Sequence, residues 1–141
     1  MSKYKTIECE FRSLQSLLKA LEDLHYGAGK VQVNQANKIN GLPMYGYHGD
    51  LRPETVSVRI DRKGIGQSSN DVGFRWNGHS YEAIISEYDS SENGPFKKNV
   101  TDRLKQRYAY HETRRIAFSK GYTVQEKAGQ NGEISLVLMR R

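Results

Sequence analysis

The sequence has 141 residues, a formal net charge of +6 at pH 7 and a single cysteine, Cys9. This length suits one domain with one hydrophobic core, and a lone cysteine excludes intramolecular disulfides and thiolate metal cages. No apolar run approaches the ~18 residues that a membrane span needs. The first residues have no apolar signal-peptide core, so we expect no membrane partner and a cytoplasmic location.

The chain opens with a pattern of period two, in which Ile7, Cys9 and Phe11 alternate with polar residues. This alternation predicts a half-buried strand. Ser13 is well placed as an N-cap, and Gly27 is well placed to end a helix. Five leucines between them share one helical face, which predicts an amphipathic helix that lies on a sheet: Leu14, Leu17, Leu18, Leu21 and Leu24.

Short apolar alternations predict further strands around residues 31–33, 56–60, 72–76 and 81–85. The last two flank Asn77-Gly78, a signal for a two-residue type I′ turn, because both turn residues must accept positive φ. That turn would place Phe74 opposite Tyr81 and Val72 opposite Ala83. We expect loops at 34–54 and 61–70, and the first is long enough to be a functional loop.

A helix of about 20 to 24 residues is expected between Gly94-Pro95 and Gly121. Two more strands follow, around residues 122–124 and 134–138. The order β-α-β-β, then β-β-α-β-β, predicts a single α+β domain over residues 1–141. We expect a mostly antiparallel sheet of about six to seven strands with two main helices.

The long helix carries the whole charge imbalance of the chain. Residues 97–120 contain only two acids, Asp102 and Glu112, so the segment has a net charge of 8 − 2 = +6, and the rest of the chain balances fourteen bases against fourteen acids. The eight bases of the segment are Lys97, Lys98, Arg103, Lys105, Arg107, Arg114, Arg115 and Lys120.

On a helical wheel, Val100, Leu104, Tyr108 and Phe118 fall within about 80° of one another and form the expected core-facing stripe. His111 lies within that stripe and Arg107 lies beside it. A kink near residues 109–112 would rotate the second half of the helix. An unpaired buried charge costs several kcal/mol, so Arg107 must meet an acid, a carbonyl, a bound anion or water.

Three functional interpretations of this helix stay open beside a purely structural one, in which Arg107 extends to the rim and His111 donates to a carbonyl. The first is a pocket for an anionic ligand such as a nucleotide, held without turnover; its candidate residues are Arg107, His111, Arg114, Arg115, Tyr108 and Tyr110. The second is an open surface for a nucleic acid, in which lysines and arginines contact the phosphate backbone and tyrosines stack on the nucleobases. Its further candidates are Lys97, Lys98, Arg103, Lys105, Tyr45 and Tyr47. The third is a small enzyme with His111 as general acid or base and Arg107 stabilising anionic charge.

The sequence offers little for catalysis otherwise. The four histidines stand far apart, with no metal-ligand spacing, and no nucleophile elbow is present. We therefore expect no metal and no cofactor, we name no catalytic residue, and we favour a binding protein over an enzyme.

Three peptides resemble a known family: DVGFRWNGHSYE (71–82), QRYAYH (106–111) and GYTVQEKAGQNGEISLVLMRR (121–141). The family is domain of unknown function 1257, which includes a conserved reading frame of plastids and cyanobacteria. The start of the chain and MYGYHGD (44–50) also fit. The family has no established activity, so the resemblance implies only an accessory or adaptor role, an AAA-type ATPase as a partner, and a location in the cytoplasm or the plastid stroma. We therefore expect a small soluble binding or adaptor protein that presents a basic and aromatic helix to an anionic partner, which is a nucleic acid, a nucleotide or an acidic protein face.

Overall fold

The structure is a computed structural model that describes residues 3–27, 29–35 and 37–141. Within these residues, nine antiparallel strands form three sheets, accompanied by two main helices, so the predicted α+β class is confirmed. The strands are β1 (Tyr4–Phe11), β2 (Val31–Val33), β3 (Leu42–Tyr45), β4 (Leu51–Val56), β5 (Val58–Ile60), β6 (Val72–Trp76), β7 (Tyr81–Ser86), β8 (Tyr122–Ala128) and β9 (Ile134–Arg140). The main helices are α1 (Leu14–Asp23) and α3 (Lys98–Ser119), with a short α2 (Glu87–Ser90) and a 3₁₀ turn at Arg62–Gly64.

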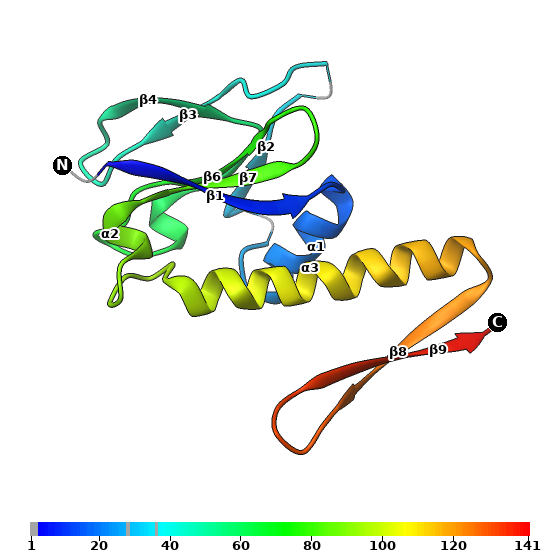
Figure 1. The fold of residues 1–141 in the computed structure, drawn as a ribbon. Helices are drawn as coiled ribbons and strands as arrows, with labels where there is room; N and C mark the ends of the chain where they lie inside the picture. Colours follow the sequence, from blue (N-terminus) through cyan, green and yellow to red (C-terminus); the bar gives the residue numbers. More distant parts are fainter. Residues whose placement is uncertain (1–2, 28, 36) are drawn as a thin grey trace.

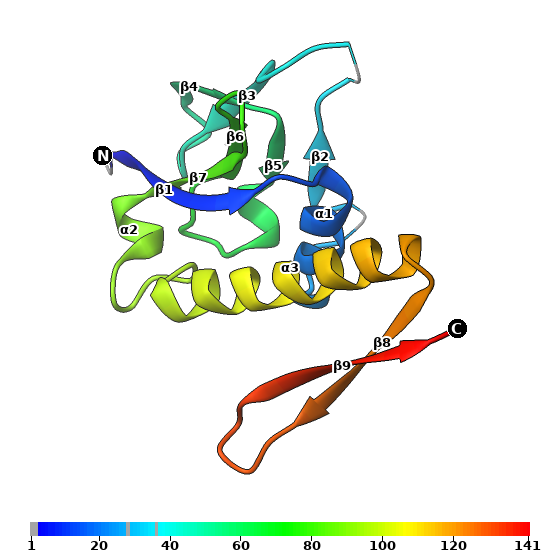
Figure 2. The same cartoon turned by 45° about the vertical axis from the view of Figure 1, so that its right-hand side comes forward.

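The central element is a five-stranded sheet in the order β1-β7-β6-β5-β2. Helices α1 and α3 cover one face of this sheet, and the β3–β4 hairpin lies on the other face (Figures 1 and 2). Gly73 of β6 makes the second packing possible, because a Cβ there would lie 2.5 Å from Val56 and 2.8 Å from Met44 of that hairpin. The sheet is therefore covered on both sides, and α3 lies on the side away from β3–β4.

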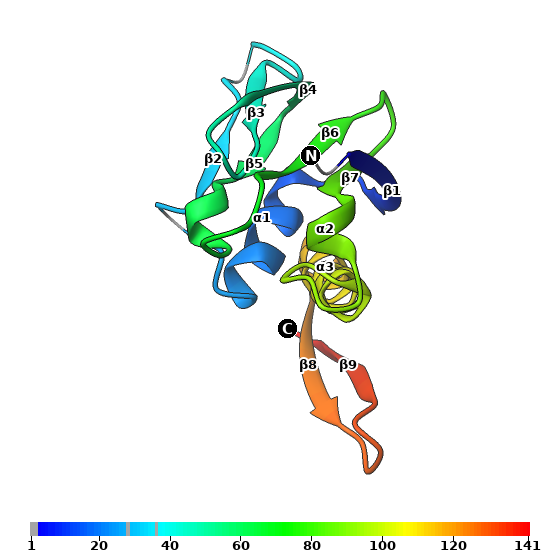
Figure 3. The same cartoon turned by 90° about the vertical axis from the view of Figure 1, so that its left-hand side faces the viewer.

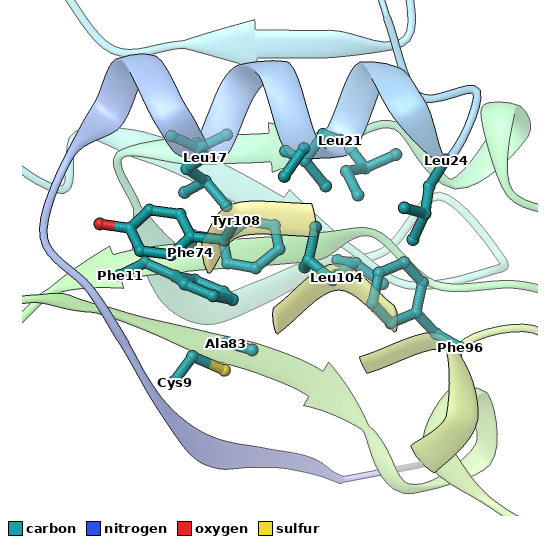
Figure 4. Packing of buried hydrophobic residues seen from close by; sticks show 14 of the residues in the cluster. Cys9, Phe11, Leu17, Leu21, Leu24, Phe74, Ala83, Phe96, Leu104 and Tyr108 are labelled. Atoms are coloured by element: carbon teal, nitrogen blue, oxygen red, sulfur yellow. The ribbon is translucent and has the colours of Figure 1, made fainter. Parts of the chain in front are cut away.

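The main core lies between the sheet and the two helices, as Figure 4 shows. Phe11 of β1 packs against Phe74 of β6 and against Tyr108 of α3, whose ring centroid is 4.7 Å from that of Phe11. Leu17 and Leu21 of α1 are fully buried in the same cluster. The leucine stripe of the first helix thus packs where the sequence predicted, and Ser13 caps this helix by accepting from Ser16 N at 3.2 Å.

The register predicted for the β6–β7 hairpin is wrong by two residues. Phe74 pairs with Ala83 and Trp76 pairs with Tyr81, so the turn residues are Gly78 and His79 rather than Asn77 and Gly78. The Asn77 side chain explains the shift, because its Oδ1 accepts from the backbone N of both His79 and Ser80 at 2.9 Å. Gly78, at φ +100°, supplies the positive φ that the first turn position needs.

The segment 34–54, predicted as a loop, contains β3 and the start of β4. These strands are short and contain Pro43 and Pro53, so the alternation of apolar and polar residues that would predict them is weak. The hairpin is held by a tertiary contact, in which Tyr45 N donates to the buried Asp71 Oδ2 at 2.8 Å. The expected single sheet of six to seven strands is therefore corrected to three sheets of five, two and two strands within the described residues.

Helix α3 is one unbroken helix, without the kink that would rotate its second half. Phe118, predicted on the buried stripe, is 56% exposed, and Ala117 is buried instead. The last turns of α3 run beyond α1 and the sheet (Figure 1), and the Phe118 side chain there is left exposed. From this end the β8–β9 hairpin extends on the side of α3 opposite the sheet (Figure 3). None of the described helices is long and apolar enough to cross a membrane.

Candidate functional site

The Arg107 guanidinium joins three elements. Its Nε donates to Asp23 Oδ2, at the end of α1, at 2.8 Å, and its Nη1 donates to both carboxylate oxygens of Glu126 in β8 at 2.9 and 3.0 Å. The Tyr110 ring lies beside it, with its centroid 4.5 Å from the guanidinium carbon. The charge that the helical wheel places beside the core is therefore met by two acids of the chain itself.

His111 shares the same carboxylate. Its Nε2 lies 2.6 Å from Asp23 Oδ2, one helical turn after Arg107. Partial burial opposes ionisation of Asp23, but the hydrogen bonds from Arg107 and His111 outweigh it and lower the pKa of Asp23. Burial would lower the pKa of Arg107, but its hydrogen bonds to Asp23 and Glu126 outweigh this effect and raise it. Asp23 is thus an ionised anchor that fixes the orientation of both α3 side chains.

Tyr108 belongs to the core rather than to a ligand site. It is 8% exposed, and its hydroxyl oxygen accepts from the backbone N of Arg12 at 2.8 Å and of Ser13 at 2.9 Å. These amides lie in the turn between β1 and α1, so the hydroxyl holds the start of α1 against α3.

Glu112 orients the next base along the helix. It accepts from Arg115 Nε at 2.7 Å, from Arg115 Nη2 at 3.2 Å and from Ser16 Oγ of α1 at 3.0 Å. The hydrogen bond from Arg115 is the main reason that the pKa of Glu112 lies below its usual range. The Arg115 side chain is still 47% exposed, so it is held in place while it faces solvent.

A cleft of about 300 Å³ opens between α1 and the C-terminal half of α3. None of the described residues that line it is a carboxylate, and neither Lys19 nor Arg114 has an ion-pair partner in the described part of the chain. Arg141 lies next to the cleft, with its guanidinium carbon 4.0 Å from the centroid of the Phe118 ring. The lining residues are Gln15, Ser16, Lys19, His111, Arg114, Arg115 and Phe118.

This arrangement can hold a small anionic group. Two guanidinium groups and an ammonium group converge on one opening, and guanidinium groups bind phosphate and carboxylate through paired hydrogen bonds. The volume is at the lower end of the ~300–1,000 Å³ range of ligand pockets. It suits a phosphate or one nucleotide unit better than a large cofactor.

The cleft brings together half of the residues predicted for an anionic ligand. His111, Arg114 and Arg115 line it, whereas Arg107 is bound to Glu126 of β8 and Tyr110 lies beside the Arg107 guanidinium. The sequence pattern does not predict Lys19 as a site residue. The sequence pattern around Lys19 indicates only that it follows Gln15 at i+4 on the polar side of the leucine stripe. Nothing in the local sequence indicates that this side of α1 packs against α3.

The candidates for nucleic-acid contacts do not form one surface. Lys98, which pairs with Asp102 at 2.7 Å, and Lys105 both line a second cavity beside β1, and Lys97 and Arg103 are exposed. Tyr45 and Tyr47 are 37% and 41% exposed, but they belong to the β3–β4 hairpin, on the other side of the sheet from α3 (Figure 2). A nucleic acid on α3 would therefore not reach these two tyrosines on the same face.

Metal and thiol chemistry have no support in the described ranges. No group of three or more His, Cys, Asp or Glu side chains there could hold a metal ion. Cys9 is buried in the core, and burial raises the pKa of its thiol, which disfavours the nucleophilic thiolate.

Two comparisons with known proteins find nothing, and one finds a family. No curated protein and no solved structure matches the chain. The model of the family described as "Protein of unknown function (DUF1257)" matches residues 20–137, from the middle of α1 into β9. The match includes Asp23, Arg107, His111 and Glu126. The chain therefore belongs to the DUF1257 family.

Proposed function

We propose that the protein is a binding module that receives an anionic group of its partner in the α1–α3 cleft. One observation carries the proposal: Lys19, Arg114 and Arg115 line a single opening with no carboxylate among its described lining residues. Arg115 is paired with Glu112, but Lys19 and Arg114 have no ion-pair partner in the described part of the chain. Elsewhere on α3, Arg107 and Lys98 are neutralised by acids of the chain.

The cleft is preorganised for this role. Glu112 fixes Arg115, and Asp23 fixes His111, so less side-chain freedom is lost when an anion binds. The cleft lies near the C-terminus of α3, where the helix dipole is unfavourable for anions. Arg141 offsets this effect in part, because its Nη2 donates to the carbonyl of Phe118 at 2.8 Å.

The partner that fits best is a single-stranded nucleic acid, bound through a nucleotide unit. A nucleotide needs a charged and an apolar surface side by side, and Phe118 supplies exposed apolar surface beside the three cations. The excess charge of residues 97–120 would attract such a polyanion over a longer range.

The test is fluorescence anisotropy with labelled single-stranded RNA across a salt series. The double variant Lys19→Gln/Arg114→Gln should weaken binding about tenfold and reduce the log–log salt slope by about 1.4, which corresponds to two lost phosphate contacts. The matched control is Lys97→Gln/Arg103→Gln, which removes the same charge from exposed positions outside the cleft and should leave the slope near that of the native chain.

Equal losses in the two double variants would mean that RNA responds only to net charge, and the cleft proposal would fail. No binding at ~50 mM salt, where phosphate contacts are strong, would remove RNA as the partner. A titration with ATP and with inorganic phosphate would then decide whether the cleft takes small anions.

A second function is favoured by a specific observation, the His111–Asp23 pair. An imidazole held by a carboxylate at the edge of an anion cleft is an arrangement that acid–base catalysts use. Arg107 would not stabilise the reacting anion in this case, since it does not line the cleft, and Arg114 or Arg115 would take that role. A turnover assay with RNA and nucleoside triphosphates separates the functions: His111→Gln abolishes turnover in a catalyst, whereas a binding or nucleotide-sequestering protein releases its ligand unchanged.

A further inference from the structure

The β8–β9 hairpin presents an apolar strand to solvent. On β9, Ile134, Leu136, Leu138 and Met139 are 37%, 36%, 56% and 48% exposed. A hairpin of two strands is marginally stable in water by itself, and three or more strands with an apolar face are usually needed. The hairpin gains support from α3 through the Arg107–Glu126 ion pair, which contacts only β8.

The outer edge of β9 is open. Within the described residues β9 pairs with β8 alone, and the hairpin extends away from the other two sheets (Figures 1 and 3). Proteins usually protect such edges with charges, prolines or bulges. The six residues ISLVLM (134–139) contain neither a charge nor a proline, and the β8–β9 pairing runs through them without a bulge.

The hydrogen bonds at the two ends of the hairpin identify the groups that face outward. Gly129 N donates to Glu133 O at 2.6 Å, and Arg141 N donates to Gly121 O at 3.0 Å. The odd-numbered residues of this strand therefore bond to β8. Because bonding direction alternates along an antiparallel strand, the even-numbered residues 134, 136, 138 and 140 direct their N–H and C=O groups to the open edge.

We propose that this edge pairs with the same edge of a second copy of the chain, antiparallel about a two-fold axis at Val137. The product is a continuous four-stranded sheet in the order β8-β9-β9-β8. In this register Leu136 lies opposite Leu138 of the second copy, and Ile134 lies opposite Arg140. All four outward-facing positions of each strand then meet an outward-facing position of the other.

The charges at the ends of the strand select this register. An axis at Val137 places Glu133 opposite Arg141 of the second copy at both ends of the interface, and all seven residues of β9 are paired. An axis at Leu136 would place Glu133 opposite Met139, and an axis at Leu138 would place Arg141 opposite Ser135. The self-complementary order, acid then apolar centre then base, is what an isologous interface requires.

The side chains agree with the pairing. Ile134, Leu136 and Leu138 lie on one face of the hairpin, the face that also carries Glu126, because side chains alternate along each strand. A two-fold axis perpendicular to the sheet keeps that face common to both copies. Six aliphatic side chains would then form one continuous stripe across the new strand pair.

The first measurement is the mass of the native chain by light scattering after size exclusion, over a wide range of concentration. We expect a mass twice that of one chain, with dissociation at the lowest concentrations. A monomer at every concentration overturns the proposal.

The register is tested with two cysteine variants under mild oxidation. Val137→Cys places two thiols opposite each other in a non-hydrogen-bonded pair, at a Cα separation of about 4.5 Å that a disulfide can bridge. Ser135→Cys is the matched control on the same face, because the two copies of residue 135 would lie about 14 Å apart along the strands. The native Cys9 is buried and does not interfere.

Disulfide-linked dimer in Val137→Cys, and its near absence in Ser135→Cys, supports the pairing. Equal cross-linking of the two variants would indicate random collision and overturns the register. Far-UV circular dichroism of both variants ensures that they are compared as folded proteins. RNA binding by the cleft is scored separately, so either proposal can fail without the other.

Discussion

The hydroxyl of Tyr108 has a structural role that can be measured as stability. It is the acceptor for two backbone amides at the start of α1, so Tyr108→Phe leaves the amides of Arg12 and Ser13 without this acceptor. We expect a loss of about 1–2 kcal/mol in the free energy of unfolding, measured by urea denaturation. The control is Tyr26→Phe, a half-buried tyrosine whose hydroxyl has no hydrogen-bond partner among the described residues, which should change stability by less than about 0.5 kcal/mol. Equal losses of stability in Tyr108→Phe and Tyr26→Phe would show that the two hydrogen bonds to the Tyr108 hydroxyl do not stabilise the fold.

Asp23 makes stability depend on pH in a defined direction. The folded state lowers its pKa, so its contribution is fully present above the ordinary value of about 3.9 and is lost as the pH falls through the lower folded value. Asp23→Asn should therefore cost about 1 kcal/mol at neutral pH, a figure reduced for the partial exposure of the side chain. The difference from the native chain should shrink toward zero as the pH falls through the lowered pKa of Asp23 in the folded state.

The control for this prediction is Glu22→Gln, an exposed acid at the neighbouring position of α1. Denaturation curves of the three proteins across pH 2–7 give the answer. If the free energies of unfolding of the native chain and of Asp23→Asn differ by the same amount at every pH in this range, the assignment of Asp23 as the ionised anchor is contradicted.

At the scale of elements, the Arg107–Glu126 ion pair docks the β8–β9 hairpin onto α3. Glu126→Gln keeps the shape but removes the charge, and it should weaken docking by about 1 kcal/mol, which corresponds to roughly fivefold faster amide exchange. Hydrogen exchange should accelerate in β8 and β9 and stay unchanged in β6 and β7. The same substitution at exposed Glu87 of α2 is the control. Faster exchange throughout the chain would indicate general destabilisation instead.

The elements also show which features the sequence could predict. Helices α1 and α3 and strand β1 were predictable, because their periodicity and caps such as Ser13 are local signals. The β6–β7 register was not, since the Asn77 side chain takes the turn amides. In the cleft, His111, Arg114 and Arg115 were predictable from charge on one helix. Lys19, and the carboxylates of Asp23 and Glu126 that neutralise Arg107, come from distant parts of the chain and follow only from the packing of α1 and β8 against α3.

At the scale of the whole molecule, the charge of α3 should make thermal stability sensitive to the type of anion. A ligand that binds only the folded state raises Tm by mass action. At matched ionic strength we expect phosphate to raise Tm more than chloride does. Lys19→Gln/Arg114→Gln should abolish the part of the Tm increase that comes from phosphate bound in the cleft. The part that comes from the general exclusion of phosphate from protein surfaces should remain. An unchanged phosphate effect in that variant would place the bound anion elsewhere.

The position of β1 in the sheet has a consequence for how the chain reaches its fold. β1 is the first strand in sequence, yet it pairs with β7, and the pair Tyr4–Ser86 joins positions 82 residues apart. Closing so long a loop must precede any gain from the contacts it allows, which slows folding. During synthesis, β1 and the leucine face of α1 must wait until β7 and α3 have been made. The N-terminal third of the chain is therefore the part that most needs protection from aggregation while the protein is being translated.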